Sequence, residues 1–157
     1  NTKAFKNLGL LAQIAERLPA PIALLAGDDA AGPLGFPAST VDLESIAEED
    51  LTHFYSGAIA LLLPSRYEGF GLPAIAALAC GCPVIAARAG ARPEVVGSAG
   101  MLVDPDDEIA WVEGAQAFFR QPSKRGELSQ LGIERAARFG WDACAQMTLA
   151  AYRRVLG

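Results

Sequence analysis

Residues 63–73 read LPSRYEGFGLP and lie between two apolar segments of the 157-residue chain. The run Ile59–Leu63 before them is short and apolar, as in a buried strand. The run Leu72–Ala79 after them is an apolar helix that ends at Gly81. A buried strand, a loop and a helix in this order form the repeating unit of a parallel sheet.

The same alternation extends in both directions from this loop. The other predicted elements are a helix at Lys6–Leu18, a strand at Ile22–Ala26, a loop at Asp28–Ser39, a strand at Thr40–Leu43, a helix capped by Ser45 and running to Tyr55, strands at Pro83–Ala87 and Met101–Val103, and helices at Asp107–Phe119, Ser123–Phe139 and Trp141–Leu156. Strands that are apolar throughout predict a parallel sheet covered on both sides. The fold class is therefore α/β, a Rossmann-like doubly wound sheet with C-terminal helices, as one domain over residues 1–157.

One strand is missing from this pattern. In doubly wound sheets the strand before the first helix is usually central. The segment Asn1–Phe5 is too short and too polar to be that strand. We therefore expect the chain to lack its first central strand, or another segment to supply it. Because Asn1 is not Met, the start of the gene product can lie upstream.

Composition excludes several classes of function. The net charge of -5 and the pI near 4.8 argue against nucleic-acid binding, which needs a basic face. His53 is the single histidine, so no metal site is expected, and Cys80, Cys82 and Cys144 are expected to be free thiols in the core or at helix ends. No apolar run approaches the roughly 20 residues of a membrane span, and no leader precedes the first helix. These features predict a cytoplasmic protein.

The loop at residues 63–73 has the chemistry of a ligand site. Two glycines allow close approach of the backbone, and the free N–H groups of a helix start attract phosphate. Glu68 would repel phosphate but can accept hydrogen bonds from sugar hydroxyls. Phosphate together with a polyol is what a nucleotide sugar presents. The alternative is a glycine-containing turn in which Glu68 faces solvent.

Several segments carry a resemblance to a known family. They are residues 63–73, ALACGCPVI at 77–85, Gly90–Val96 with PEVV at 93–96, Gly100–Pro105, and Arg135–Phe139 followed by Trp141. Together they resemble the large retaining glycosyltransferase family, glycosyl transferases group 1, which includes sucrose synthases, glycogen synthases and bacterial mannosyltransferases. Members have two Rossmann-like domains facing a cleft, the GT-B architecture. The chain resembles the C-terminal domain, which binds the nucleotide-diphosphate sugar donor.

The resemblance also implies roles for individual residues. Glu68 would contact hydroxyls of the donor sugar, and Lys6 would bind the diphosphate and offset its charge as it departs. The backbone of Gly69, Phe70, Gly71 and Leu72 would lie against the sugar and diphosphate. Neither a metal nor another cofactor is implied, and Asp28-Asp29 is interpreted as a turn at a strand end.

Two departures from the family pattern affect donor binding. The family has a second glutamate eight positions after the first, where this chain has Ala76, and that residue usually holds the ribose. An arginine that accompanies the lysine would fall before Asn1. Loss of a charged acceptor could cost about 1.5–3 kcal/mol.

Three functional hypotheses follow. The first is retaining transfer of a sugar to an acceptor sugar, lipid or small molecule. The acceptor would be held by an N-terminal domain absent from this chain, with possible peripheral membrane contact there, and the isolated chain would be inactive. The second is a degenerate, non-catalytic binding or interaction module, marked by Ala76. The third, a dinucleotide-dependent oxidoreductase, is disfavoured because no glycine fingerprint follows a first strand.

Several further residues are expected to have structural roles. Arg66 should pair with an acidic surface residue, and Glu94 should brace a short helix after Pro93. His53 should be a packing residue. The aromatic residues expected in the core are Trp111, Phe118 and Phe119.

Overall fold

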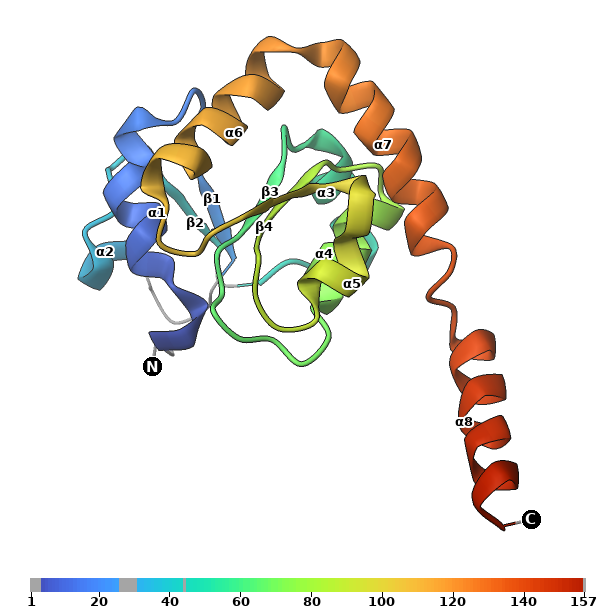
Figure 1. Ribbon diagram of the computed structural model, residues 1–157. Helices are drawn as coiled ribbons and strands as arrows, with labels where there is room; N and C mark the ends of the chain where they lie inside the picture. Colours follow the sequence, from blue (N-terminus) through green and yellow to red (C-terminus); the bar gives the residue numbers. More distant parts are fainter. Residues whose placement is uncertain (1–3, 26–30, 44, 157) are drawn as a thin grey trace.

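The computed structural model describes residues 4–25, 31–43 and 45–156 as short strands alternating with helices (Figure 1). The strands are β1 (Ala23–Leu25), β2 (Val41–Leu43), β3 (Leu61–Leu63), β4 (Val84–Ala87) and β5 (Met101–Val103). The α-helices are α1 (Leu8–Ile14), α2 (Ala31–Leu34), α3 (Leu51–Gly57), α4 (Leu72–Ala79), α5 (Arg92–Val96), α6 (Glu108–Arg120), α7 (Pro122–Ala136) and α8 (Trp141–Leu156). Short 3-10 turns are η1 (Ala4–Lys6), η2 (Ala15–Arg17), η3 (Glu48–Asp50) and η4 (Gly97–Ala99).

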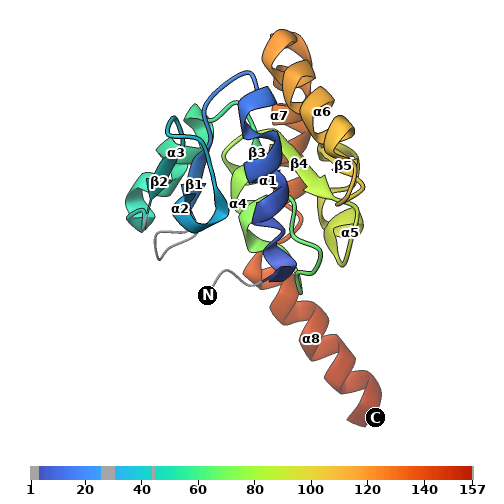
Figure 2. The same ribbon diagram turned by 90° about the vertical axis from the view of Figure 1, so that its left-hand side faces the viewer.

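The strand pairs are parallel, which confirms the predicted α/β class. β1 pairs with β2, while β3, β4 and β5 pair in that order. In the described part of the chain these are two separate sheets, and no pairing joins β1 to β3. Figure 2 shows the β1–β2 pair standing beside the larger sheet, with α1 in front of the boundary between them.

The core lies on both faces of β4. Val84 and Ala86 belong to a cluster with α3, α4 and α7, whereas Ile85 and Ala87 belong to a cluster with α1 and α6. All four side chains are fully buried, because successive residues of a strand point to opposite faces and helices cover both. This burial explains why the strand is apolar throughout.

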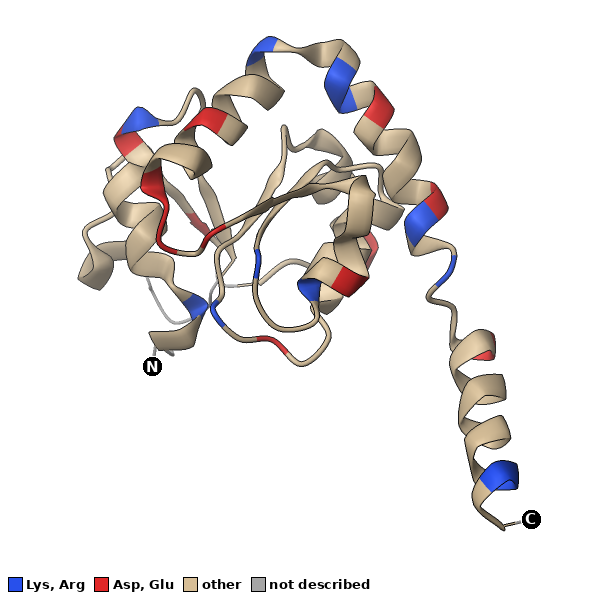
Figure 3. Ribbon diagram, viewed as in Figure 1, with Lys and Arg blue, Asp and Glu red and all other residues tan. Residues whose placement is uncertain are grey.

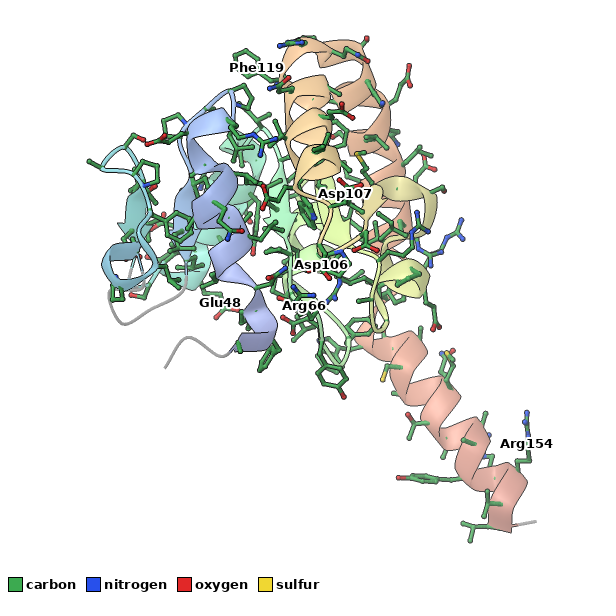
Figure 4. The ribbon with its side chains drawn as sticks, turned by 60° about the vertical axis from the view of Figure 1, so that its left-hand side comes forward. Glu48, Arg66, Asp106, Asp107, Phe119 and Arg154 are labelled. Atoms are coloured by element: carbon green, nitrogen blue, oxygen red, sulfur yellow. The ribbon has the colours of Figure 1, made fainter. Side chains whose placement is uncertain are left out.

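Two of the three aromatic residues predicted for the core are confirmed. Trp111 and Phe118 are buried, and the Trp111 indole Nε1 donates to Asp104 O at 2.9 Å. Phe119 was predicted wrongly, because its side chain is 46% exposed. Figure 4 shows it pointing outward near the end of α6. Position 119 lies about 100° around the helix from the buried Phe118, and this turn takes its side chain out of the core.

The predicted first helix is shorter and interrupted. Asn7 has a left-handed backbone with φ of 55°, so η1 and α1 are separate elements, and α1 ends at Ile14. The loop predicted at Asp28–Ser39 contains the four-residue helix α2. The Asp28-Asp29 turn lies outside the described residues.

Of two helix starts, one lacks a side-chain cap and the other has one. The predicted cap by Ser45 is wrong, because η3 begins at Glu48 after Ala47 and has no side-chain cap. By contrast, Asp107 caps α6, since its carboxylate accepts from Ala110 N at 3.0 Å. This bond satisfies one of the helix-start N–H groups that lack a partner within the helix.

The C-terminal helix α8 projects from the rest of the molecule in both ribbon views (Figures 1 and 2). None of its described residues is buried, and Trp141 at its start is 84% exposed. No helix in the described ranges combines the length and the apolar character needed to cross a membrane.

Candidate functional site

The carboxyl ends of β3, β4 and β5 meet at one edge of the larger sheet, where several loops contain charged residues (Figure 3). The loop after β3 begins with buried Pro64 and Ser65 and then becomes exposed at Arg66 and Tyr67. Parallel strands bring these loops together because their carboxyl ends share one edge, which is where ligands bind in open α/β sheets.

Lys6 and Glu68 meet at this edge. The Lys6 Nζ lies 2.7 Å from Glu68 Oε1, which is both a hydrogen bond and an ion pair. The side chain of Glu68 is 16% exposed and that of Lys6 is 41% exposed. The two residues that the sequence singled out are therefore in direct contact across 62 positions of chain.

Asn7 holds the start of α1 against the strand ends. Its Nδ2 donates to Pro105 O at 2.9 Å and to Pro64 O at 3.4 Å. The left-handed backbone at Asn7 turns its side chain toward these carbonyls, and asparagine tolerates that conformation better than most residues. Next to it, Arg66 N donates to Phe5 O at 2.6 Å, so the segment carrying Lys6 is tied to the loop carrying Glu68.

Arg66 pairs with an acidic surface residue, as predicted. Its guanidinium makes two hydrogen bonds to the Asp106 carboxylate, and Figure 4 shows the two side chains close together. The hydrogen bond from Arg66 holds the pKa of Asp106 below its ordinary value of 3.8. This pair ties the loop after β3 to the loop after β5.

Arg92 is the main feature of the site that the sequence analysis missed. It is the first residue of α5, yet its side chain is fully buried. Nε donates to Ala87 O at 2.9 Å and Nη2 donates to Ser65 O, so one guanidinium joins the ends of β4 and β3. Its Nη1 has no hydrogen-bond partner. Burial lowers the pKa of Arg92, and the charge of Glu68 opposes that shift.

These cations keep Glu68 ionised. Burial by itself would raise the pKa of Glu68. Hydrogen bonds from Lys6 and Ser65, together with the charges of Lys6 and Arg92, outweigh burial and leave the pKa below the ordinary 4.5. At neutral pH the site therefore presents a carboxylate that can accept hydrogen bonds.

Two glycines let the loops of the site approach one another. Gly71 is the N-cap of α4 with φ of 94°, a conformation that side chains with a Cβ rarely adopt. Gly90 has φ of 57°, and a Cβ there would lie 3.0 Å from Glu68 O. The loop after β4 can therefore lie directly against the backbone of Glu68.

The predicted donor-binding residues are at the start of α4. Gly69 and Phe70 are exposed, Gly71 is buried, and Leu72 is 66% exposed as the first helical residue. No side chain caps this helix. Pro73 has no N–H and Ala74 N donates to Gly71 O at 2.9 Å, so the backbone N–H of Leu72 is the one available at the helix start. The Phe70 ring packs edge-on against Phe139, with ring centroids 5.6 Å apart.

Ala76 lies in the second turn of α4 and is partly buried against the core cluster of α3, α4 and α7. A methyl group at this position offers no acceptor. Glu94 is exposed on α5, and its backbone O accepts from Arg135 Nη2, so the bracing at this position comes from the backbone. His53 is exposed on α3.

No group of three or more potential metal ligands occurs in the described ranges. Cys80, Cys82 and Cys144 are free. Cys82 is buried, and burial raises the pKa of its thiol to about 11, which keeps it protonated and unreactive. Cys80 caps the end of α4, whereas Cys144 is exposed on α8 and so is not a core residue.

The chain belongs to the glycosyl transferases group 1 family, whose model matches residues 34–135. The matched range contains the loop after β3, the start of α4 and Arg92. The fold is that of one Rossmann-like half of the GT-B architecture, as the resemblance implied.

Individual relatives agree with this membership. The chain is 37% identical over 108 residues to O-antigen chain mannosyltransferase B of Escherichia coli, covering 69% of the chain and 28% of that protein. It is 40% identical over 111 residues to D-inositol 3-phosphate glycosyltransferase of Frankia alni, covering 69% and 27%. It superposes on sucrose-phosphate synthase of Thermosynechococcus elongatus with a TM-score of 0.85 at 28% identity, covering 98% of the chain and 43% of that protein. The chain thus spans less than half the length of each.

Proposed function

We propose that this chain is the donor-binding, C-terminal half of a retaining glycosyltransferase that uses a nucleotide-diphosphate sugar. The observation that carries the proposal is the Lys6–Glu68 pair beside the uncapped start of α4. A cation and a free backbone N–H at a helix start suit a diphosphate, whereas an ionised carboxylate suits sugar hydroxyls. The family membership and the names of the relatives in Escherichia coli and Frankia alni support glycosyl transfer.

The pair contributes to catalysis by exchanging partners. When the donor enters, the Lys6 ammonium moves from Glu68 to the diphosphate, and Glu68 accepts hydrogen bonds from the sugar. As the glycosidic bond to the diphosphate breaks and a bond forms between the sugar and an acceptor oxygen, negative charge grows on the leaving phosphate, and Lys6 and the Leu72 N–H at the start of α4 stabilise it. These groups supply positive charge at the diphosphate, so the proposal requires no metal or other cofactor.

The acceptor site belongs to another part of the full-length enzyme in this proposal. The chain spans 27–28% of the two curated relatives. In a GT-B enzyme the acceptor sugar, lipid or small molecule lies across the cleft from the donor, so the chain alone would bind donor without transferring it. The free thiols fit a reducing compartment, and we place the enzyme in the cytoplasm.

The test is calorimetric titration of the chain with UDP, GDP and ADP and with their glucose and mannose conjugates. We expect one base to be preferred and its sugar conjugate to bind more tightly than the bare nucleotide. Glu68→Gln should weaken the conjugate by about 10-fold or more, since hydrogen bonds to a charged group contribute about 1.5–3 kcal/mol. Binding of the bare nucleotide should change far less, because Lys6 remains.

Two further variants test the role of Lys6 and provide a control for the loss of a carboxylate. Lys6→Met should weaken nucleotide and conjugate alike, because it removes the charge facing the diphosphate. Glu113→Gln removes one carboxylate from an exposed position of α6 and should change neither affinity. Equal loss of nucleotide and conjugate in Glu68→Gln would contradict a sugar-binding role for Glu68, and no binding of any nucleotide by the parent chain would contradict the proposal.

Ala76 favours a second candidate, a degenerate module that binds donor weakly or serves as an interface. Replacing it tests how much binding was lost. We expect Ala76→Glu to tighten nucleotide binding at least several-fold, because the new carboxylate can accept from the ribose hydroxyls. Ala76→Gln, which adds similar bulk without charge, is the matched control. Tighter binding by the glutamate variant supports a functional pocket, whereas no change together with weak parent binding favours the degenerate module.

A further inference from the structure

Phe70 stands between two glycines in the loop that leads into α4. A Cβ at Gly69 would meet no other atom within 4 Å, so the backbone there lies in open space. Gly71 has φ of 94°, in a region that glycine enters readily. Because glycine restricts the backbone less than any other residue, the order of this segment depends on the contacts of the Phe70 ring.

The Phe70 ring packs against Phe139, which lies between α7 and α8. The two rings meet edge to face, with an angle of 70° between their planes. In this geometry the positive edge of one ring faces the negative face of the other, which adds attraction to the burial of apolar area. Figure 1 shows α7 passing alongside α4 before the chain turns toward α8, so this contact joins the loop before α4 to the turn after α7.

Phe139 is itself held by the end of α7 and by Arg135. Its backbone N–H donates to Ala136 O at 3.0 Å. The Arg135 guanidinium lies over the Phe139 ring, with Cζ 5.2 Å from the ring centroid, which is within the range of a cation–π contact. The same guanidinium donates from Nε to Val95 O at 3.1 Å and from Nη2 to Glu94 O. Phe139 is therefore fixed against both α7 and α5.

The Phe70 contact bears on backbone groups that α4 does not hold. Gly71 O accepts from Ala74 N at 2.9 Å, so the peptide unit that carries the Leu72 N–H is fixed by the helix. The N–H groups of Phe70 and Gly71 come before that unit, in the segment bounded by the two glycines. Their direction relative to the Leu72 N–H is set by where the Phe70 ring is held.

We propose that Phe139 is a positioning residue for ligand binding: its ring holds Phe70, and so directs the N–H groups of Phe70 and Gly71 toward an anionic ligand. Phe139 acts through Phe70 and not by touching the ligand. The identity of the ligand, a nucleotide-diphosphate sugar, rests on the proposed function. Because the contact exists in the free chain, the loop is ordered before the ligand arrives, and binding does not bear the cost of ordering it.

The first test is ¹⁵N relaxation of the free chain. In Phe139→Ala we expect the order parameters of the Phe70 and Gly71 amides to fall from about 0.85, typical of rigid backbone, to about 0.6 or lower. Amides of α6 should keep their values. Phe139→Tyr keeps the ring and should restore the parent values. Phe119→Ala is the matched control, because it removes the same side chain from a position of α6 that is 46% exposed, and it should change neither amide.

Ligand affinity is the second readout. Among the glucose and mannose conjugates of UDP, GDP and ADP, the one that the parent chain binds most tightly should bind about 3- to 10-fold more weakly to Phe139→Ala, which is the size of effect that one aromatic pair supports. Phe139→Tyr should again restore it. If Phe139→Ala fails to fold, Phe70→Leu breaks the same contact at a side chain that is 40% exposed, and it should lower the order parameter of Gly71 in the same way.

Three outcomes would overturn the proposal. The first is unchanged order parameters at Phe70 and Gly71. The second is an equal fall throughout α4 and α7, which would make Phe139 a general packing residue. The third is a more mobile loop with unchanged affinity for the conjugate. A parent chain that binds no nucleotide contradicts the proposed function instead, and the relaxation measurements still decide whether Phe139 holds the loop.

Discussion

Replacing Arg92 by methionine is expected to lower the free energy of unfolding by about 2–4 kcal/mol. The guanidinium is fully buried and donates to Ala87 O and to Ser65 O, which belong to the ends of two different strands. Methionine has similar length but leaves Ser65 O without its arginine donor in a buried place, while Ala87 O keeps only the hydrogen bond from Ala89 N. Removal of a buried charge, whose Nη1 has no partner, offsets part of this loss.

The same substitution should change the acid dependence of stability. The pKa of Glu68 is depressed in the folded protein, so its contribution is present above the unfolded pKa near 4.5 and is lost as pH falls through the folded pKa. Without Arg92 the pKa of Glu68 rises toward its ordinary value. The difference in stability between parent and variant should therefore shrink as pH falls below about 4.5.

Urea unfolding followed by far-UV circular dichroism, from pH 3 to pH 7, measures both effects. Arg88→Met is the matched control, because Arg88 is an exposed arginine at the same sheet edge with one hydrogen bond, to Leu102 O. It should cost less than about 1 kcal/mol. An Arg92→Met variant as stable as the Arg88 control would show that the guanidinium does not hold the two strand ends together.

Replacing Trp111 by alanine is expected to cost about 3–5 kcal/mol, a large share of the stability of a domain of this size. The side chain is fully buried in the cluster that joins α1 and α6 to β4 and β5. Its removal leaves a cavity too large for the neighbours to fill, and it also leaves Asp104 O without the indole donor.

Two substitutions separate these contributions. Trp111→Phe keeps most of the packing and loses the hydrogen bond, so we expect it to cost about 1–2 kcal/mol. Trp141→Ala removes the same side chain from a position that is 84% exposed on α8, and it should change the free energy of unfolding by less than about 0.5 kcal/mol. Equal costs at positions 111 and 141 would mean that the indole of Trp111 is not packed in the core in solution.

The order of strands and helices could be predicted because each signal was local. β3 and β4 are short apolar runs bounded by turn residues, and α4 begins after Gly71 and ends before Gly81. The parallel pairing followed from the same alternation. The predictions that were wrong depended on longer-range contacts: the helix across Asn7 is interrupted because the Asn7 side chain bonds to Pro64 O and Pro105 O, which belong to distant loops.

The loop at residues 63–73 was predicted to be the candidate site from its glycines, its carboxylate and the helix that follows. Arg92 was missed for a physical reason. An arginine at the start of a helix is normally solvated, and no sequence pattern indicates that the ends of β3 and β4 would enclose it. The one indication in the sequence was its position: Arg92 directly precedes Pro93, in a loop that was already expected at the carboxyl edge of the sheet.

The sequence by itself determined the fold class, the family and the candidate loop at residues 63–73. The signals for these were apolar strands, glycine and proline residues at helix ends, and the loop motif, and each depends on residues that are close together in the chain. Only the tertiary structure decided that Lys6 meets Glu68, that Arg92 is buried between two strand ends, and that β1 and β3 stand apart around an apolar cavity. These features depend on which segments meet in space. Their energies come from desolvation and unsatisfied hydrogen bonds, which exist only once the chain is folded.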